Sequence, residues 1–116
     1  MRPEELSASV DTLSSSAAEG ELLAGDVAQD RTRATFARVH ARELGDVVDH
    51  EAEKLADATP RPAIADEKSE AVDLADEISQ ALGQIQVRPS DQRTGREAER
   101  QLSQLADRAT RLADSL

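Results

Sequence analysis

The chain has 116 residues, of which 38% are hydrophobic and 33% charged, with a formal net charge of −10 and no cysteine. This length suits one domain spanning residues 1–116, and the missing thiols exclude disulfide and thiolate chemistry. The acidic charge and the near absence of aromatic side chains argue against a nucleic-acid partner, because DNA and RNA are polyanions whose bases stack on aromatic rings.

The composition also bears on location. No stretch is apolar for 18 residues, so no membrane association is expected, and the start of the chain lacks the basic and apolar segments of a secretory signal. We therefore expect a cytoplasmic protein. A secreted mature chain is the alternative if Met1 is a cloning residue.

The first predicted elements lie in residues 3–58, where small or apolar residues recur at seven-residue spacing. Such a repeat predicts helices that bury a narrow, coiled-coil-like seam. Ser16 and Glu19 have the spacing of a capping box, and Gly20 and Gly25 lower helix propensity. These features favour a short helix over residues 3–15 and a long one over 17–58, with one continuous helix as the alternative. The repeat consists of Leu6, Leu13, Gly20, Val27, Ala34, Ala41, Val48 and Leu55.

Prolines separate the later elements. Pro60 and Pro62 end the long helix, and Pro89 ends a third helix predicted over residues 62–86. A second capping-box pattern, from Thr94 to Glu97, places the start of the last helix between residues 90 and 94, and that helix is predicted over 91–115. We expect an all-α fold, an antiparallel bundle of three to four helices with one long member.

Self-association is expected on two grounds. Leu, Ile, Val and Phe together form about a fifth of the chain, so a monomer has little material for a core. A helix over 17–58 is also about 60 Å long, and it overhangs the later helices by roughly 25 Å. A homodimer, or packing on another helical protein, would complete the bundle through seam residues Leu6, Leu13, Val27, Phe36, Leu44, Val48, Leu55, Leu102, Leu105 and Leu112.

Charge is segregated along the chain. Residues 1–30 carry seven acids and one arginine, residues 31–42 carry four arginines and no acid, and residues 43–77 carry twelve acids and three basic residues. Acidic and basic stretches are therefore available as partners on neighbouring antiparallel helices, although each exposed pair contributes only about 0 to 1 kcal/mol.

Two pairs on the predicted long helix, His40 with Glu43 and His50 with Glu53, have the spacing of metal ligands on one helix face. The two histidines are about 15 Å apart along the axis, so they cannot share one ion, and a site needs carboxylates from later helices. The alternative interpretation is solvated histidines on a polar flank. No cofactor is expected.

Three further features have candidate roles. Arg31, Arg38 and Arg42 are predicted to lie on one helix face. They could bind an anion, or they could form ion pairs with the acids of residues 1–30. Phe36, the only aromatic residue, is predicted to anchor a helix crossing in the core or an interface. The run of serines from 14 to 16 is interpreted as a helix boundary rather than a nucleophile, because no base is near in sequence.

These observations favour a non-enzymatic protein that acts through helix–helix packing, either with itself or with a protein partner. A small metal- or ligand-binding bundle that uses His40, Glu43, His50 and Glu53 is the main alternative. A disordered acidic adaptor that folds on binding is the third hypothesis, suggested by the low content of large apolar residues.

Overall fold

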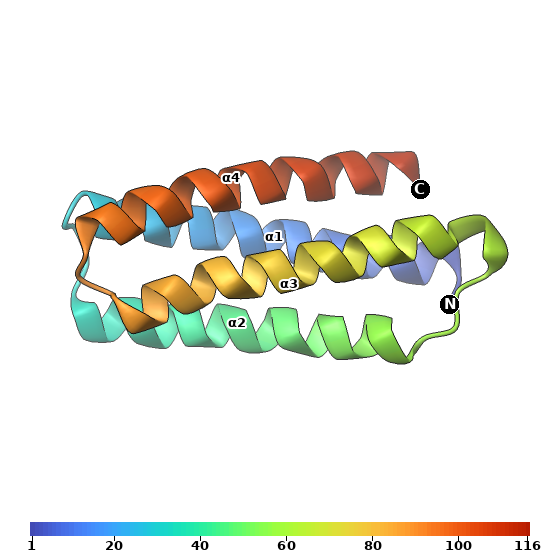
Figure 1. The fold of residues 1–116 in the computed structure, drawn as a ribbon, viewed down its shortest axis with the longest axis horizontal. Coiled ribbons are helices and arrows are strands. Elements are labelled where there is room, and N and C mark those ends of the chain that lie inside the picture. The colour runs from blue at the N-terminus through green and yellow to red at the C-terminus, as the bar shows by residue number, and fades with distance from the viewer.

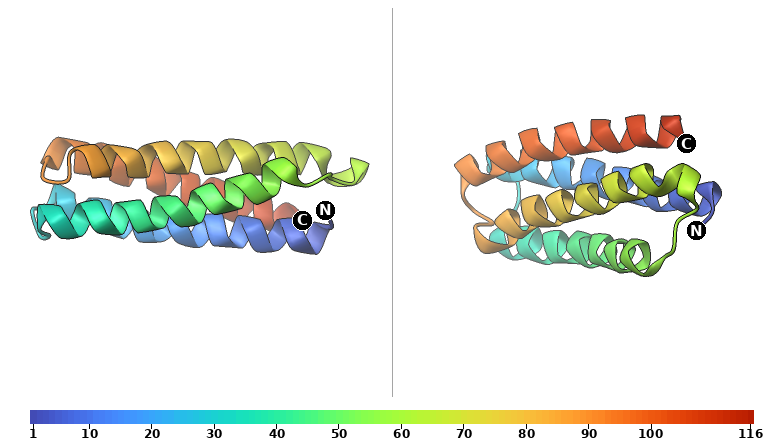
Figure 2. Two further views of the ribbon diagram at one scale, coloured as in Figure 1. Left: turned by 90° about the horizontal axis from the view of Figure 1, so that it is seen from below. Right: turned by 45° about the vertical axis from the view of Figure 1, so that its right-hand side comes forward.

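Helix-favouring segments separated at residues 29–33, 58–64 and 88–91 fold into four antiparallel α-helices in the computed structural model, which describes residues 1–116. The molecule is a rod of 46 × 22 × 15 Å, with both termini at the same end (Figures 1 and 2). No strand is present, which confirms the all-α bundle. The elements are α1 (Pro3–Ala28), α2 (Ala34–Asp57), the 3-10 turn η1 (Pro62–Ile64), α3 (Ala65–Val87) and α4 (Gln92–Ser115).

The helices are arranged in an up-down-up-down order, in which each packs on two neighbours. Helix α1 contacts α4 most extensively and also contacts α2, whereas α3 lies against α2 and α4 (Figure 1). None of the four is long and apolar enough to cross a membrane.

One continuous core of 25 buried residues runs through all four helices and η1. Seven of the eight seven-residue repeat positions are buried, and the eighth, Ala34, is half-buried at the start of α2. Nine of the core residues are alanines, which bury little apolar area but let helix backbones approach closely.

The long helix predicted over residues 17–58 is wrong, as is the break after residue 15. Helix α1 continues to Ala28, and the break lies at residues 29–33. Ser16 is a buried residue in the middle of α1 and caps nothing. The four helices have 26, 24, 23 and 24 residues, so none exceeds another by the predicted overhang, and the predicted need for a second subunit to cover it does not arise.

Glycines are tolerated inside α1 because other helices pack closely against them. A Cβ on Gly20 would stand 2.9 Å from a methyl of Leu82 and 3.1 Å from one of Leu102, and a Cβ on Gly25 would meet the carboxylate of Glu99. Glycine costs about 1 kcal/mol in a helix interior, and the close approach offsets that cost. Low helix propensity at these positions therefore marks packing rather than a helix end.

Helix α1 ends in a Schellman motif. The Arg31 amide donates to the Asp26 carbonyl, the Asp30 amide donates to the Val27 carbonyl, and Asp30 has a φ of 55°. A left-handed residue after the last turn is the usual helix terminator, and glycine usually fills it. Here an aspartate does, so the sequence carries no glycine signal for this break.

Replacing Asp30 by glycine is expected to raise the free energy of unfolding by about 1 kcal/mol, because a left-handed φ is strained for any residue with a Cβ. Urea denaturation measures the change. The matched control is Gln29→Gly, where φ is −100° and glycine relieves no strain. A gain of equal size in both variants would contradict the interpretation that Asp30 is strained by its left-handed conformation.

Helix α4 begins with an aspartate cap. The backbone amide of Thr94 donates to the Asp91 carboxylate at 3.2 Å, and the Thr94 hydroxyl donates to the same oxygen. The start of this helix falls within the predicted window, but the capping residue is Asp91 rather than Thr94. The side-chain hydrogen bond from Thr94, followed by the backbone one, lowers the pKa of Asp91 below its ordinary value of 3.8.

This cap predicts a specific acid sensitivity. Because the folded-state pKa of Asp91 is lowered, its stabilising contribution is complete above pH 3.8 and is lost as the pH falls through the lowered pKa. Asparagine caps a helix without titrating. We therefore expect the melting temperature of the wild type to decrease relative to that of Asp91→Asn when the pH is lowered below about 4. A difference that stays constant between neutral and acid pH contradicts this prediction.

Candidate functional site

An exposed apolar stripe runs along the flank of α2 that borders α1. Phe36, Val39 and Val47 have 59%, 37% and 45% of their surface exposed, whereas the adjoining face of the same helix is buried. Their spacing places them, with His40 and Glu43 between them, on one face of about three turns. We call these five residues the α2 stripe.

The predicted burial of Phe36 in the core is wrong. Its ring lies edge-on to that of His40, with the centroids 5.5 Å apart and the planes at 62°. Beyond that contact the ring is largely open to water, although an aromatic side chain is the largest apolar group this chain possesses.

His40 connects the α2 stripe to α1. Its Nε2 lies 3.8 Å from an Oε atom of Glu19, which is an ion-pair distance when the ring is protonated. The Nδ1 atom is buried and has no hydrogen-bond partner. The ring is therefore fixed between Phe36 and helix α1, at the edge of the apolar surface.

The structure does not assemble the predicted metal ligands. Nowhere in the chain do three or more His, Asp or Glu side chains form a group that could hold an ion. His40 faces α1, whereas α3 and its acids pack on the other side of α2, where Asp49 accepts a hydrogen bond from Ser79 at 2.8 Å. Glu43, His50 and Glu53 are exposed.

A buried carboxylate occupies the seam of α2 instead. Glu51 is 8% exposed, one of its oxygens lies 3.5 Å from Lys54 Nζ, and the other is buried without a partner. Sequence reasoning missed this residue. The signal was present, because Glu51 lies seven residues after Leu44, in the apolar register.

The arginines of residues 31–42 do not converge on one anion site. Arg31 pairs with Asp26 at 3.3 Å, which is the one predicted contact with an acid of residues 1–30. Arg38 donates to the backbone carbonyl of Gln86 on α3, and Arg42 is exposed. Arg31 and Arg38 therefore have different partners on different elements, and no two of the three arginines share a partner.

The predicted interface residues lie mostly inside the chain. Nine of the ten are buried between helices of the same chain, and Phe36 alone is exposed. The apolar repeat visible in the sequence is therefore buried by packing among the four helices of a single chain. The buried nine are Leu6, Leu13, Val27, Leu44, Val48, Leu55, Leu102, Leu105 and Leu112.

A groove of about 360 Å³ separates α1 from α2 beside the α2 stripe. Val47 and Leu44 form its α2 wall, and Ser15, Ser16 and Glu19 contribute to its α1 wall. Ser14 faces α4, where its hydroxyl lies 3.3 Å from that of Thr110. The serine run is thus split between two sides of α1 rather than marking a helix boundary.

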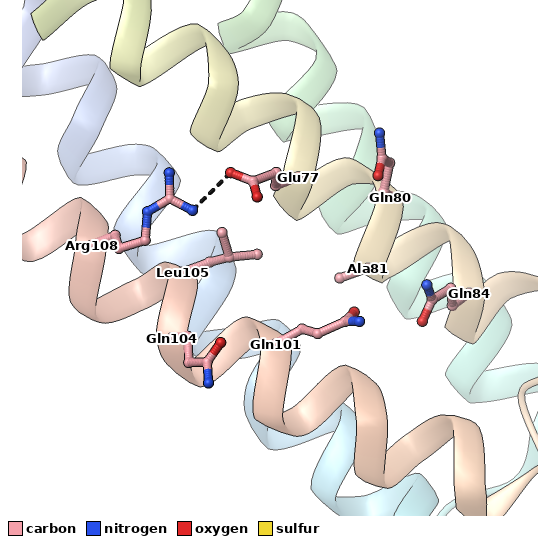
Figure 3. A pocket seen from close by; sticks show the side chains of 8 residues that line it. All are labelled: Glu77, Gln80, Ala81, Gln84, Gln101, Gln104, Leu105 and Arg108. Atoms are coloured by element: carbon pink, nitrogen blue, oxygen red, sulfur yellow. Dashed lines mark hydrogen bonds and ion pairs between the residues drawn. The ribbon is translucent and has the colours of Figure 1, made fainter.

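A second groove, of about 220 Å³, lies between α3 and α4 (Figure 3). An ion pair of 2.8 Å between Arg108 and Glu77 lies across one end, and exposed glutamine amides line the rest. We call it the glutamine groove. Its amide side chains are Gln80, Gln84, Gln101 and Gln104.

Comparisons with known proteins add no assignment. No protein-family model, no curated protein and no solved structure matches this chain.

Proposed function

We propose that this protein is a non-enzymatic interaction protein that binds a helix of another chain on the α2 stripe. The observation that carries the proposal is the exposure of Phe36, 59%, in a chain that has few large apolar side chains and buries most of them. Aromatic residues are enriched at protein interfaces and dominate their energetics.

The spacing of the α2 stripe supports a helical partner. Phe36, Val39 or His40, Glu43 and Val47 follow the positions at which an amphipathic helix presents its anchors. The adjoining α1–α2 groove extends the surface, since Val47 belongs to both. The other large exposed apolar residues, Leu22 and Val87, are single side chains on other helices, which is normal for a protein surface.

The glutamine groove is less favoured as a binding site. Its four amides are exposed, and only Ala81 and Leu105 contribute apolar surface. Amides in water already have hydrogen-bond partners, so exchanging water for a ligand gains only about 1 kcal/mol per bond.

Site-specific photocrosslinking tests the proposal. A photoreactive phenylalanine analogue replaces Phe36 in the protein expressed at native level in its own host. The matched control carries the same analogue at Gln104, in the glutamine groove on α4. A discrete product from position 36 alone, with the same chain or with another, is the expected result. No product from position 36, or the same products from both positions, contradicts the proposal.

A further inference from the structure

We infer that the helix bound by the α2 stripe is α2 of a second copy of this chain, in an antiparallel pair related by a two-fold axis. The inference rests on the proposed function and names its partner. The argument comes from the distribution of charge along α2 and from the order of residues in the α2 stripe.

The charge along α2 and the loop before it changes from positive to negative once. Residues 31–42 carry four arginines and no acid, whereas residues 43–57 carry six acids and one lysine. Antiparallel pairing of two such helices places each basic half against an acidic half, and parallel pairing places like charges together. The net charge of −10 opposes association in general, so a local match of this kind is needed.

The charges are available for this pairing. The chain forms four ion pairs, and Arg33 in the basic half and Asp46 and Glu53 in the acidic half take part in none of them. All three are exposed. Segregated charge that the chain does not neutralise internally is therefore presented by the helix that also exposes the aromatic residue.

The order of residues fixes a register. A two-fold axis near the sign change, between residues 41 and 42, sets Phe36 opposite Val47 of the second copy and His40 opposite Glu43 of the second copy. Both pairs occur twice, as an isologous interface requires. Apolar contacts then lie outside a central pair of His–Glu contacts.

His40 faces several titratable groups in this arrangement. Glu19 approaches it from α1 within its own chain, and Glu43 lies one turn further along α2. Glu43 of the second copy would approach the part of the ring that is open to water, since the His40 side chain is 33% exposed. All of these groups are acids, so the environment of the ring in the pair is acidic.

Spin-label distances test the register directly, because the chain contains no cysteine of its own. Single labels are attached through Thr35→Cys and Asp57→Cys, both at exposed positions on α2. An antiparallel pair predicts intermolecular separations of about 20 Å at residue 35 and about 46 Å at residue 57, from the 1.5 Å rise per residue. A parallel pair predicts about 10 Å at both, which would overturn the inference.

A charge reversal provides the second readout. Glu43→Lys sets a cation opposite His40 of the second copy, and we expect it to raise the dimer dissociation constant by about fivefold or more. Asp114→Lys makes the same change in net charge at an exposed position on α4 and is expected to leave the constant unchanged. Equal effects of the two variants overturn the inference.

The outcomes separate this inference from the proposed function. If the purified chain shows no intermolecular spin coupling while position 36 crosslinks to a different protein in the host, the self-pairing is wrong and the proposed function stands. If position 36 yields no crosslink of either kind, the proposed function fails as well.

Discussion

Replacing Leu102 by alanine is expected to lower the free energy of unfolding by about 3 kcal/mol. Leu102 is fully buried on α4, and its two methyl groups lie 3.1 and 3.6 Å from the place where a Cβ on Gly20 would stand. Gly20, which faces Leu102, has no side chain to fill the cavity. The cavity should therefore stay open, and the full loss in the free energy of unfolding is expected. Urea denaturation measures this loss.

The matched control removes the same atoms from a leucine in water. Leu22 on α1 is 73% exposed, so Leu22→Ala is expected to change the free energy of unfolding by less than about 0.5 kcal/mol. Equal losses in the two variants would show that Leu102 does not fill the core between α1 and α4.

Replacing Gly95 by alanine is expected to lower the free energy of unfolding by about 2 kcal/mol, because overpacking forces backbones apart. A Cβ at this position would stand 2.5 Å from the backbone nitrogen of Ala28 and 3.0 Å from the carbonyl oxygen of Ala24. These are backbone atoms, which cannot rotate away as a side chain does. The first turn of α4 therefore depends on glycine to approach the last turns of α1.

Gly83 is the matched control for this substitution. It lies in α3 with nothing within 4 Å of the position that a Cβ would occupy. Gly83→Ala is expected to raise the free energy of unfolding by up to about 1 kcal/mol, because alanine has the higher helix propensity. Thermal or urea denaturation measures both changes. A loss of stability in Gly95→Ala with a gain in Gly83→Ala supports the close α1–α4 packing, whereas a gain in both variants contradicts it.

The positions of the later helices could be predicted because prolines and an apolar repeat mark them. Pro60, Pro62 and Pro89 lie in the breaks, and Ala98, Leu102, Leu105, Ala109 and Leu112 are all buried on α4. Proline constrains the backbone of any chain, and a helical apolar pattern is legible without knowledge of its partner.

The first break could not be predicted because its signal is conformational. Asp30 takes the left-handed position that glycine usually marks, and the seven-residue spacing from Val27 to Ala34 continues across the loop by coincidence of length. The two glycines that suggested an earlier break lie instead at close helix contacts. Only the positions of α3 and α4 distinguish these two uses of glycine.

The candidate site was only partly predictable. The apolar register of α2 passes through Ala37, Ala41, Leu44, Val48 and Leu55, all of which are buried. Phe36 lies outside that register, so the repeat itself places it away from the buried face, although its hydrophobicity suggested the core. The arrangement of the helices determines which side of α2 packs on α1. The sequence does not specify this arrangement, so it could not predict that His40 faces α1.

Sedimentation equilibrium of the wild type and Phe36→Glu tests the central claim, that the α2 stripe pairs with itself. We predict that the wild-type mass rises with concentration from 12.5 kDa towards twice that value, and that the variant stays at 12.5 kDa with an unchanged circular dichroism spectrum. Concentrations up to about 100 μM are needed, because small interfaces bind weakly. A wild type that remains at 12.5 kDa throughout, or a variant that associates equally well, would contradict the account.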